Sequence, residues 1–146
     1  MSARLTLRVA LGILAVSGLV IGFWAAAAPH SFFSSFPGAG HAWVAGDGPY
    51  NEHLVRDVGD LNLALAVVMI AAAVSLTRPV VIAAALATLV YSVPHFAYHA
   101  ANLQTVAAGD RVAELASLAV PILLGVVVLA VLPAASATTN PGGPSS

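Results

Sequence analysis

Four long apolar runs dominate the chain, at residues 7–27, 58–77, 80–101 and 112–132. Each has about 20 residues, the length that a helix needs to cross a hydrocarbon core roughly 30 Å thick. A membrane barrel would alternate apolar and polar residues, whereas the stretch from Val67 to Val74 is apolar throughout. Because a spanning backbone must satisfy its own hydrogen bonds, the runs predict an all-α fold, a four-helix transmembrane bundle.

Polar positions separate these runs unevenly. Residues 29–56 form the longest connection, in which aromatic side chains alternate with glycine and proline. Aromatic rings favour the headgroup layer, so we expect a long extracytoplasmic loop that anchors at the interface or covers a site. Residues 133–146 are rich in Pro, Gly, Ser and Thr, which predicts a disordered tail. The pattern therefore predicts a single integral membrane domain over residues 1–132.

The few basic residues predict the orientation. Arg4, Arg8 and Arg78 lie on one side of the predicted membrane, and Arg56 and Arg111 lie on the other. The positive-inside bias then places both termini in the cytoplasm.

The first run also has features of a signal peptide. Basic residues precede it, and small alanines follow it at residues 25–28. It is longer than a usual signal core, however, and it contains Trp24 and the spacing Gly18-x-x-x-Gly22, which lets membrane helices approach closely. We therefore expect residues 1–28 to be retained as the first membrane helix.

Composition excludes several classes of protein. Hydrophobic residues make up 60% of the chain and charged residues 8%, whereas a soluble domain has roughly 25% charged residues. A net charge of −1 gives no electrostatic basis for binding nucleic acid. Since the chain has no cysteine, disulfides, thiolate metal sites and cysteine nucleophiles are excluded.

The start of the second predicted helix carries ionisable residues at helical spacing, namely Glu52, His53, Arg56, Asp57 and Asp60. Asn51 just upstream is a suitable helix cap. A solvated helix start, with carboxylates near the positive end of the helix dipole, would explain Glu52 and Asp57. Asp60 lies deeper and needs a partner. We therefore expect Arg56 to be the counter-ion of both Glu52 and Asp60.

The third and fourth predicted helices add two further groups. Tyr91, His95 and His99 follow one another at intervals of four residues, and so do Asp110 and Glu114. Two histidines one helical turn apart can bind a metal, or they can form hydrogen bonds near the membrane surface. A metal shell would use His95 and His99, completed by His53 or by a carboxylate of Glu52, Asp57 or Glu114.

All of these residues are expected at one end of the bundle. This polar cluster comprises Glu52, His53, Arg56, Asp57, Asp60, Tyr91, His95, His99, Asp110 and Glu114. The opposite half of the bundle has few ionisable residues beyond its three arginines. Because charged groups facing lipid are unfavourable, we expect the histidines to face the bundle interior, opposite His53, Asp57 and Glu114.

Several motifs carry a resemblance to known proteins. They are Phe36-Pro37-Gly38, Trp43-Val44, the run 48–59 and His95-x-x-x-His99. With these motifs the chain resembles small four-helix membrane proteins of actinobacteria, an uncharacterised family that is loosely similar to DoxX in size and helix count. The resemblance covers the chain except for its tail. It implies a four-helix protein in a bacterial plasma membrane, and it implies no activity.

Three functions remain open at this point. The first is a structural or accessory protein that contacts the lipid bilayer and pairs with another membrane protein or a second copy. The second is a redox protein that binds a transition metal through His95 and His99, or a haem through one of them and a ligand from another helix such as His53. The third is a proton relay, or a module that binds or transports a small ligand. Side chains that converge on one centre would favour a metal, whereas one-to-one ion pairs would favour the structural role.

Overall fold

The computed structural model describes residues 2–137 of the chain. Within this range the elements are α1 (Ala3–Ala27), α2 (Pro29–Ser35), the short 3-10 helix η1 (Val44–Asp47), α3 (Glu52–Ser75), α4 (Arg78–Ala101), the 3-10 helix η2 (Leu103–Thr105) and α5 (Arg111–Ala137). Four of them, α1, α3, α4 and α5, are long and apolar enough to cross a membrane. The predicted all-α fold with four membrane-length helices is therefore confirmed.

Two of these helices begin before their apolar runs, because polar side chains cap them. The Leu5 N–H donates to the Ser2 hydroxyl at 3.3 Å, and the Leu54 N–H donates to the Asn51 side chain at 3.1 Å. Each cap satisfies a backbone N–H that has no partner inside the helix. As a result α3 starts at Glu52 and not at residue 58, and the polar first turns belong to the helix.

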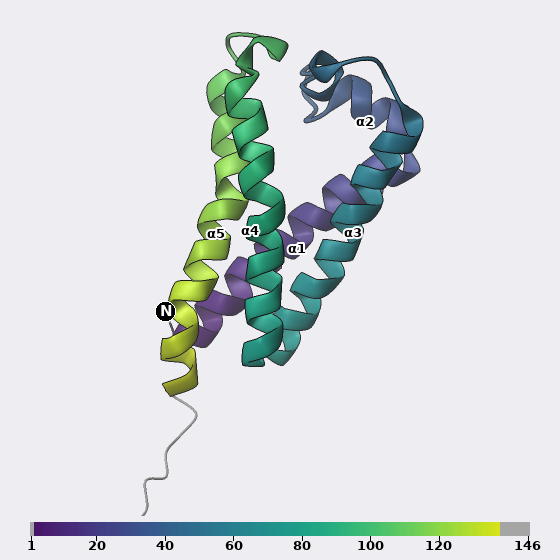
Figure 1. Cartoon of the computed structure of the whole chain (residues 1–146). Coiled ribbons are helices and arrows are strands. Elements are labelled where there is room, and N and C mark those ends of the chain that lie inside the picture. Colours follow the sequence, from purple (N-terminus) through teal and green to yellow (C-terminus); the bar gives the residue numbers. More distant parts are fainter. Residues whose placement is uncertain (1, 138–146) are drawn as a thin grey trace, which may run out of the picture.

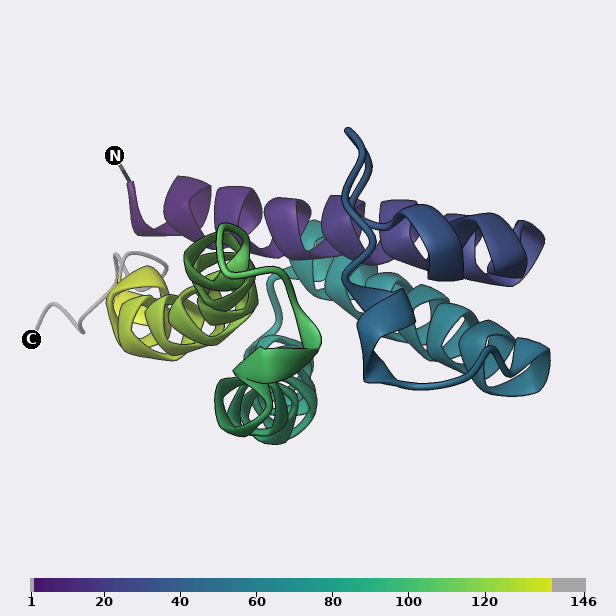
Figure 2. The ribbon, with the colours of Figure 1, turned by 90° about the horizontal axis from the view of Figure 1, so that it is seen from above.

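The helices form two pairs that diverge toward one end of the molecule (Figure 1). α1 packs mainly against α3, and α4 packs mainly against α5. α1 runs obliquely, so its first turns also contact α5 while its last turns lie beside α3 (Figures 1 and 2). All four long helices meet in one apolar core that includes Leu7, Leu11, Met69, Val81 and Val128. We call the end with this core the core end; both described chain ends and the α3–α4 turn lie there.

Small residues allow α1 and α3 to approach closely. A Cβ atom added at Gly59 would lie 2.5 Å from the backbone nitrogen of Ala26, and one at Gly22 would lie 3.0 Å from the Gly59 carbonyl oxygen. A Cβ at Gly18 would lie 3.1 Å from the Asn62 carbonyl oxygen. The predicted role of the Gly18-x-x-x-Gly22 spacing in close helix packing is therefore confirmed.

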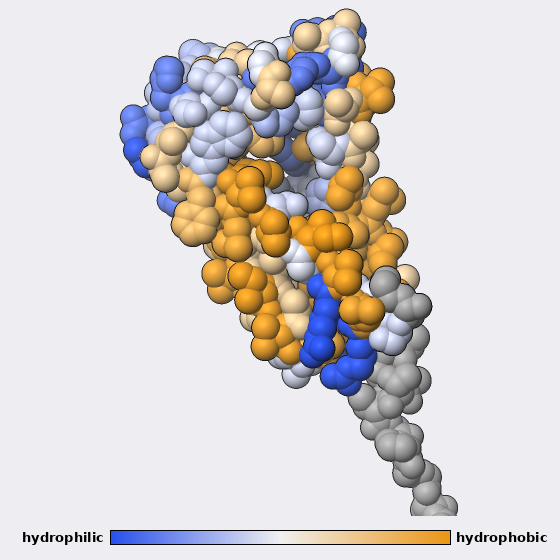
Figure 3. All heavy atoms as spheres, turned by 180° about the vertical axis from the view of Figure 1, so that it is seen from behind, coloured by the Kyte–Doolittle hydropathy of each residue, from blue (hydrophilic) through white to orange (hydrophobic). Residues whose placement is uncertain are grey.

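The opposite end, which we call the polar end, comprises α2, η1, η2 and the adjoining ends of the long helices. Figure 3 shows hydrophilic residues gathered there above a broad apolar band, with a smaller hydrophilic group at the core end. Phe32 of α2 packs with Ala25 and Val55. The connection between α1 and α3 is shorter than the predicted loop over residues 29–56, because α3 already begins at Glu52. It is also partly helical, since it contains α2 and η1.

At its far end α5 continues to Ala137. The helix therefore extends into residues 133–137, which the sequence assigned to the tail. The remainder of that predicted tail, residues 138–146, lies outside the described residues.

Candidate functional site

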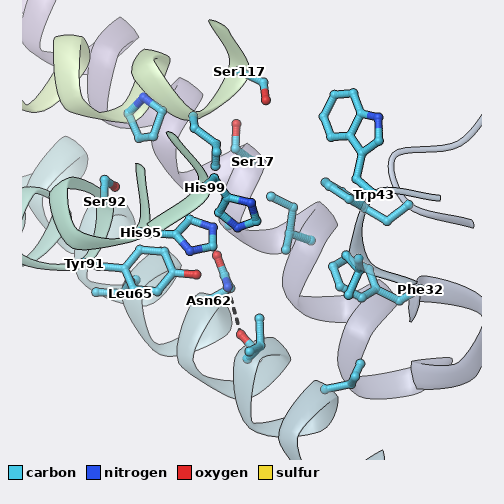
Figure 4. A pocket seen from close by; sticks show the side chains of 18 of the residues that line it. Ser17, Phe32, Trp43, Asn62, Leu65, Tyr91, Ser92, His95, His99 and Ser117 are labelled. Atoms are coloured by element: carbon cyan, nitrogen blue, oxygen red, sulfur yellow. Dashed lines mark hydrogen bonds between the residues drawn. The ribbon is translucent and has the colours of Figure 1, made fainter. Parts of the chain in front are cut away.

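A cavity of about 840 Å³ lies between the two helix pairs on the side of the polar end. Ligand pockets in proteins usually measure about 300–1,000 Å³, so its size suits a small organic molecule. All four long helices contribute to its wall, and aromatic residues of α2 and the η1 segment cover one end. Figure 3 shows a hollow in the molecular surface below the hydrophilic residues, and Figure 4 shows the cavity from close by.

One wall of the cavity is a row of rings on α4. The Tyr91 and His95 rings stack with their centroids 5.4 Å apart, and the His95 and His99 rings meet edge to face at 4.7 Å. Their spacing of four residues places all three on one helical face. Asn62 of α3 lines the same cavity (Figure 4), so the row and the other helix pair share its wall.

The most deeply buried charged group of the site is Glu114 on α5. Its side chain is 3% exposed, and its Oε1 lies 2.9 Å from Nδ1 of His99, which is 12% exposed. The geometry at Nδ1 does not meet the alignment of a hydrogen bond, so the contact is an ion pair when His99 carries a proton. The second carboxylate oxygen, Oε2, is buried and has no hydrogen-bond partner among the described residues. Glu114 is therefore only partly satisfied by the protein.

Further polar residues continue along the wall at membrane depth. The Asn62 side-chain amide donates to the Val58 carbonyl at 2.8 Å, and the Thr88 hydroxyl donates to the Ala84 carbonyl at 3.0 Å. Both bonds lie within one helix, so these side chains satisfy their donors locally. The rest of the deeper wall is mainly apolar and includes Leu65, Met69 and Leu124.

The ionisable residues at the start of α3 lie apart from this cavity. His53 and Asp57 form a pair at 3.3 Å with side chains that are 88% and 55% exposed. Neither residue lines the cavity. The structure therefore separates His53 and Asp57 from His95, His99 and Glu114, which the sequence analysis had placed opposite them.

Arg56 has different partners from those predicted. Its Nε donates to Oε1 of Glu52 at 2.9 Å, and its Nη1 donates to the carbonyl of Ala26 in the last turn of α1. Asp60 is exposed and forms no ion pair with Arg56 in the described part of the chain. The close crossing at Gly59 brings the unsatisfied carbonyls at the end of α1 within reach of the guanidinium, which explains the change of partner.

Asp110 belongs to a contact between the two connections of the polar end. Its Oδ2 lies 2.8 Å from Nδ1 of His41 and accepts a hydrogen bond from Nε1 of Trp43 at 3.0 Å. These two hydrogen bonds lower the pKa of the Asp110 carboxyl below its ordinary value of 3.8. A side chain at Gly46 would overlap the Thr105 carbonyl, so the connections also touch there. We call the Asp110, His41 and Trp43 contact the latch.

No metal centre forms from these side chains. Among residues 2–137 there is no group of three or more His, Asp or Glu side chains that could hold a metal ion. Of the predicted ligands, His95, His99 and Glu114 line the cavity, whereas His53 lies on the outer surface. The described residues therefore do not bring these four predicted ligands together, and a metal site stays a prediction.

Comparisons of the chain with protein-family models, with curated proteins and with solved structures found no match. The resemblance to actinobacterial membrane proteins accordingly stays a prediction. The four membrane-length helices indicate a small integral membrane protein in contact with the lipid bilayer.

Proposed function

We propose that this small membrane protein binds a lipophilic molecule through a hydrogen-bonding group, in the cavity between its helix pairs. The observation that carries the proposal is the buried carboxylate of Glu114, a residue of the cavity wall, whose Oε2 has no hydrogen-bond partner among the described residues. A buried polar atom without a partner costs about 1–3 kcal/mol. A donor on the bound molecule would remove that cost.

The remaining walls suit the apolar part of such a molecule. Leucine, methionine and proline side chains line the deeper cavity, and aromatic rings of the connection cover the polar end. The hollow in Figure 3 is bordered by the apolar band of the surface, so the molecule would enter from the lipid. This arrangement, an apolar cavity with few polar groups, is typical of ligand sites.

A specific observation also favours a second function, that of a structural or accessory protein. The ion pairs of the polar end are one-to-one, namely His53 with Asp57, Arg56 with Glu52 and His41 with Asp110. The first two pairs lie within α3 and the third joins the two connections, so together they define no common centre. In this proposal the cluster stabilises the bundle, and the exposed apolar helix faces contact lipid, another membrane protein or a second copy.

Native mass spectrometry of the protein, released from its own membranes in mild detergent, tests the ligand-binding proposal. We expect a bound small molecule on the wild type, its loss from Glu114→Leu, and its retention by Glu52→Leu, a matched change at an exposed carboxylate. If the wild type carries no molecule and no added lipophilic probe binds in the cavity, the structural proposal is the one that stands.

A further inference from the structure

We infer that the polar end of the bound molecule is a cation, an amine or an ammonium group on a lipophilic body. This inference rests on the proposed function and specifies the sign of the charge on the ligand. Its first support is the charge of the cavity wall, which includes the carboxylates of Asp47 and Glu114 and no lysine or arginine. A negatively charged molecule would meet like charge there, and the basic side chains on the wall are the imidazoles of His95 and His99, of which His99 already contacts Glu114.

The second support is the environment of Glu114. Its carboxylate is 3% exposed, and only one of its two oxygens contacts His99. Arg111, one turn earlier on α5, is not on the cavity wall and forms no ion pair with Glu114 among the described residues. An ammonium group adds the attraction between opposite full charges to its hydrogen bond with a carboxylate, whereas a neutral hydroxyl group supplies the hydrogen bond alone. The free Oε2 is therefore a better partner for an ammonium group than for a hydroxyl group.

The third support is the aromatic content of the wall. Six aromatic rings line the cavity, those of Phe32, Phe33, Phe36, Trp43, Tyr50 and Tyr91. Several contact each other, with centroid distances of 4.8 Å for Phe32 and Phe36 and 6.2 Å for Phe36 and Trp43. Ring faces attract cations through the negative side of their quadrupole. The aromatic rings and the carboxylates thus both favour a positively charged ligand.

The test compares three probes that share one alkyl tail: decylammonium, 1-decanol and decanoate. The protein is placed in nanodiscs of phosphatidylcholine and carries Trp24→Phe, which leaves Trp43 on the cavity wall as the reporter. Binding is measured as the change in Trp43 emission, corrected with empty nanodiscs for partition into the bilayer. We expect decylammonium to bind about tenfold more tightly than 1-decanol, equivalent to about 1.4 kcal/mol, because it adds the attraction between opposite charges to its hydrogen bond. We expect decanoate not to bind.

Two variants test whether the preference for decylammonium over 1-decanol arises from the carboxylates of the cavity. Glu114→Gln should reduce the binding of decylammonium to the level of 1-decanol, and Asp47→Asn at the exposed rim should reduce it in part without affecting the fold. Asp57→Asn, an exposed carboxylate away from the cavity, should change nothing. Equal binding of decylammonium and 1-decanol, or tighter binding of decanoate, would overturn the cation inference and leave the proposed function in place. If none of the probes changes Trp43 emission, both are wrong.

Discussion

At the scale of single residues, the site depends on one ion pair between α4 and α5. The carboxylate of Glu114 and the ring of His99 are both largely buried, so neither can exchange its partner for water. Removing one member would leave the other buried without compensation. The contact is therefore expected to stabilise the helix pair as well as to shape the cavity.

His99→Leu should destabilise the protein by about 3–5 kcal/mol, because it strands the Glu114 carboxylate in an apolar environment. The double variant His99→Leu with Glu114→Leu should recover a large part of that loss, since it removes the stranded charge. Thermal unfolding in detergent measures both. An equal melting temperature for His99→Leu and wild type would show that the pair does not hold the helices.

Because of the latch, we expect the stability of the folded protein to depend on pH. The folded state lowers the pKa of Asp110, so the latch contributes fully above the ordinary value of 3.8 and is lost as the pH falls through the lowered pKa. Asp110→Asn should therefore melt at a lower temperature than wild type near neutral pH, and the difference should shrink in strong acid. Asp57→Asn, in an exposed pair on α3, serves as the control. A difference that does not change with pH would contradict this account.

At the scale of elements, the apolar runs alone predicted the four membrane-length helices. They could not predict where α3 begins, because the residues of its capped first turns are polar and do not contribute to the run. Helix spacing correctly grouped Tyr91, His95 and His99 on one face. The same reasoning placed His53 and Asp57 in the site, since sequence spacing shows which residues share a face but not which way that face turns.

The rotation of α3 is determined instead by its glycine contact with α1. Gly59→Ala should destabilise the bundle by about 1–3 kcal/mol, because its Cβ would meet the backbone of α1 and the helices would have to separate. Gly12→Ala is the matched control, since nothing lies within 4 Å of an added Cβ at that position. Helix propensity alone favours alanine over glycine by about 1 kcal/mol, so Gly12→Ala should not lose stability. Chemical denaturation of both variants tests the expectation, and a Gly59→Ala variant as stable as Gly12→Ala would contradict it.

At the scale of the whole molecule, contacts between distant segments complete the polar end. His41 and Trp43 lie 69 and 67 residues before Asp110, so no local pattern could reveal the latch. The sequence had predicted that this aromatic segment either anchors at the membrane interface or covers a site. In the structure the segment covers one end of the cavity and joins the two helix pairs through Asp110.

The orientation of the protein in the membrane is also a property of the whole molecule, and it is a prediction. From the arginine bias we expect the polar end outside the cell and the core end in the cytoplasm. Because the chain has no cysteine, Ala45→Cys and Ser75→Cys give single exposed labelling sites at the two ends. An impermeant maleimide added to intact cells should label the first variant only. Labelling of the second variant alone would reverse the orientation.

The divergence of the helix pairs has a mechanical consequence. All four long helices are joined in the apolar core at one end, while the cavity lies toward the other. A helix of 24 residues such as α4 is about 36 Å long. A tilt of about 5° at the core would then shift its far end by about 3 Å, from the same rise per residue. The two helix pairs are joined at the core and separate toward the cavity. We therefore expect the packing of a core side chain such as Leu11 to affect the distance between the pairs at the cavity.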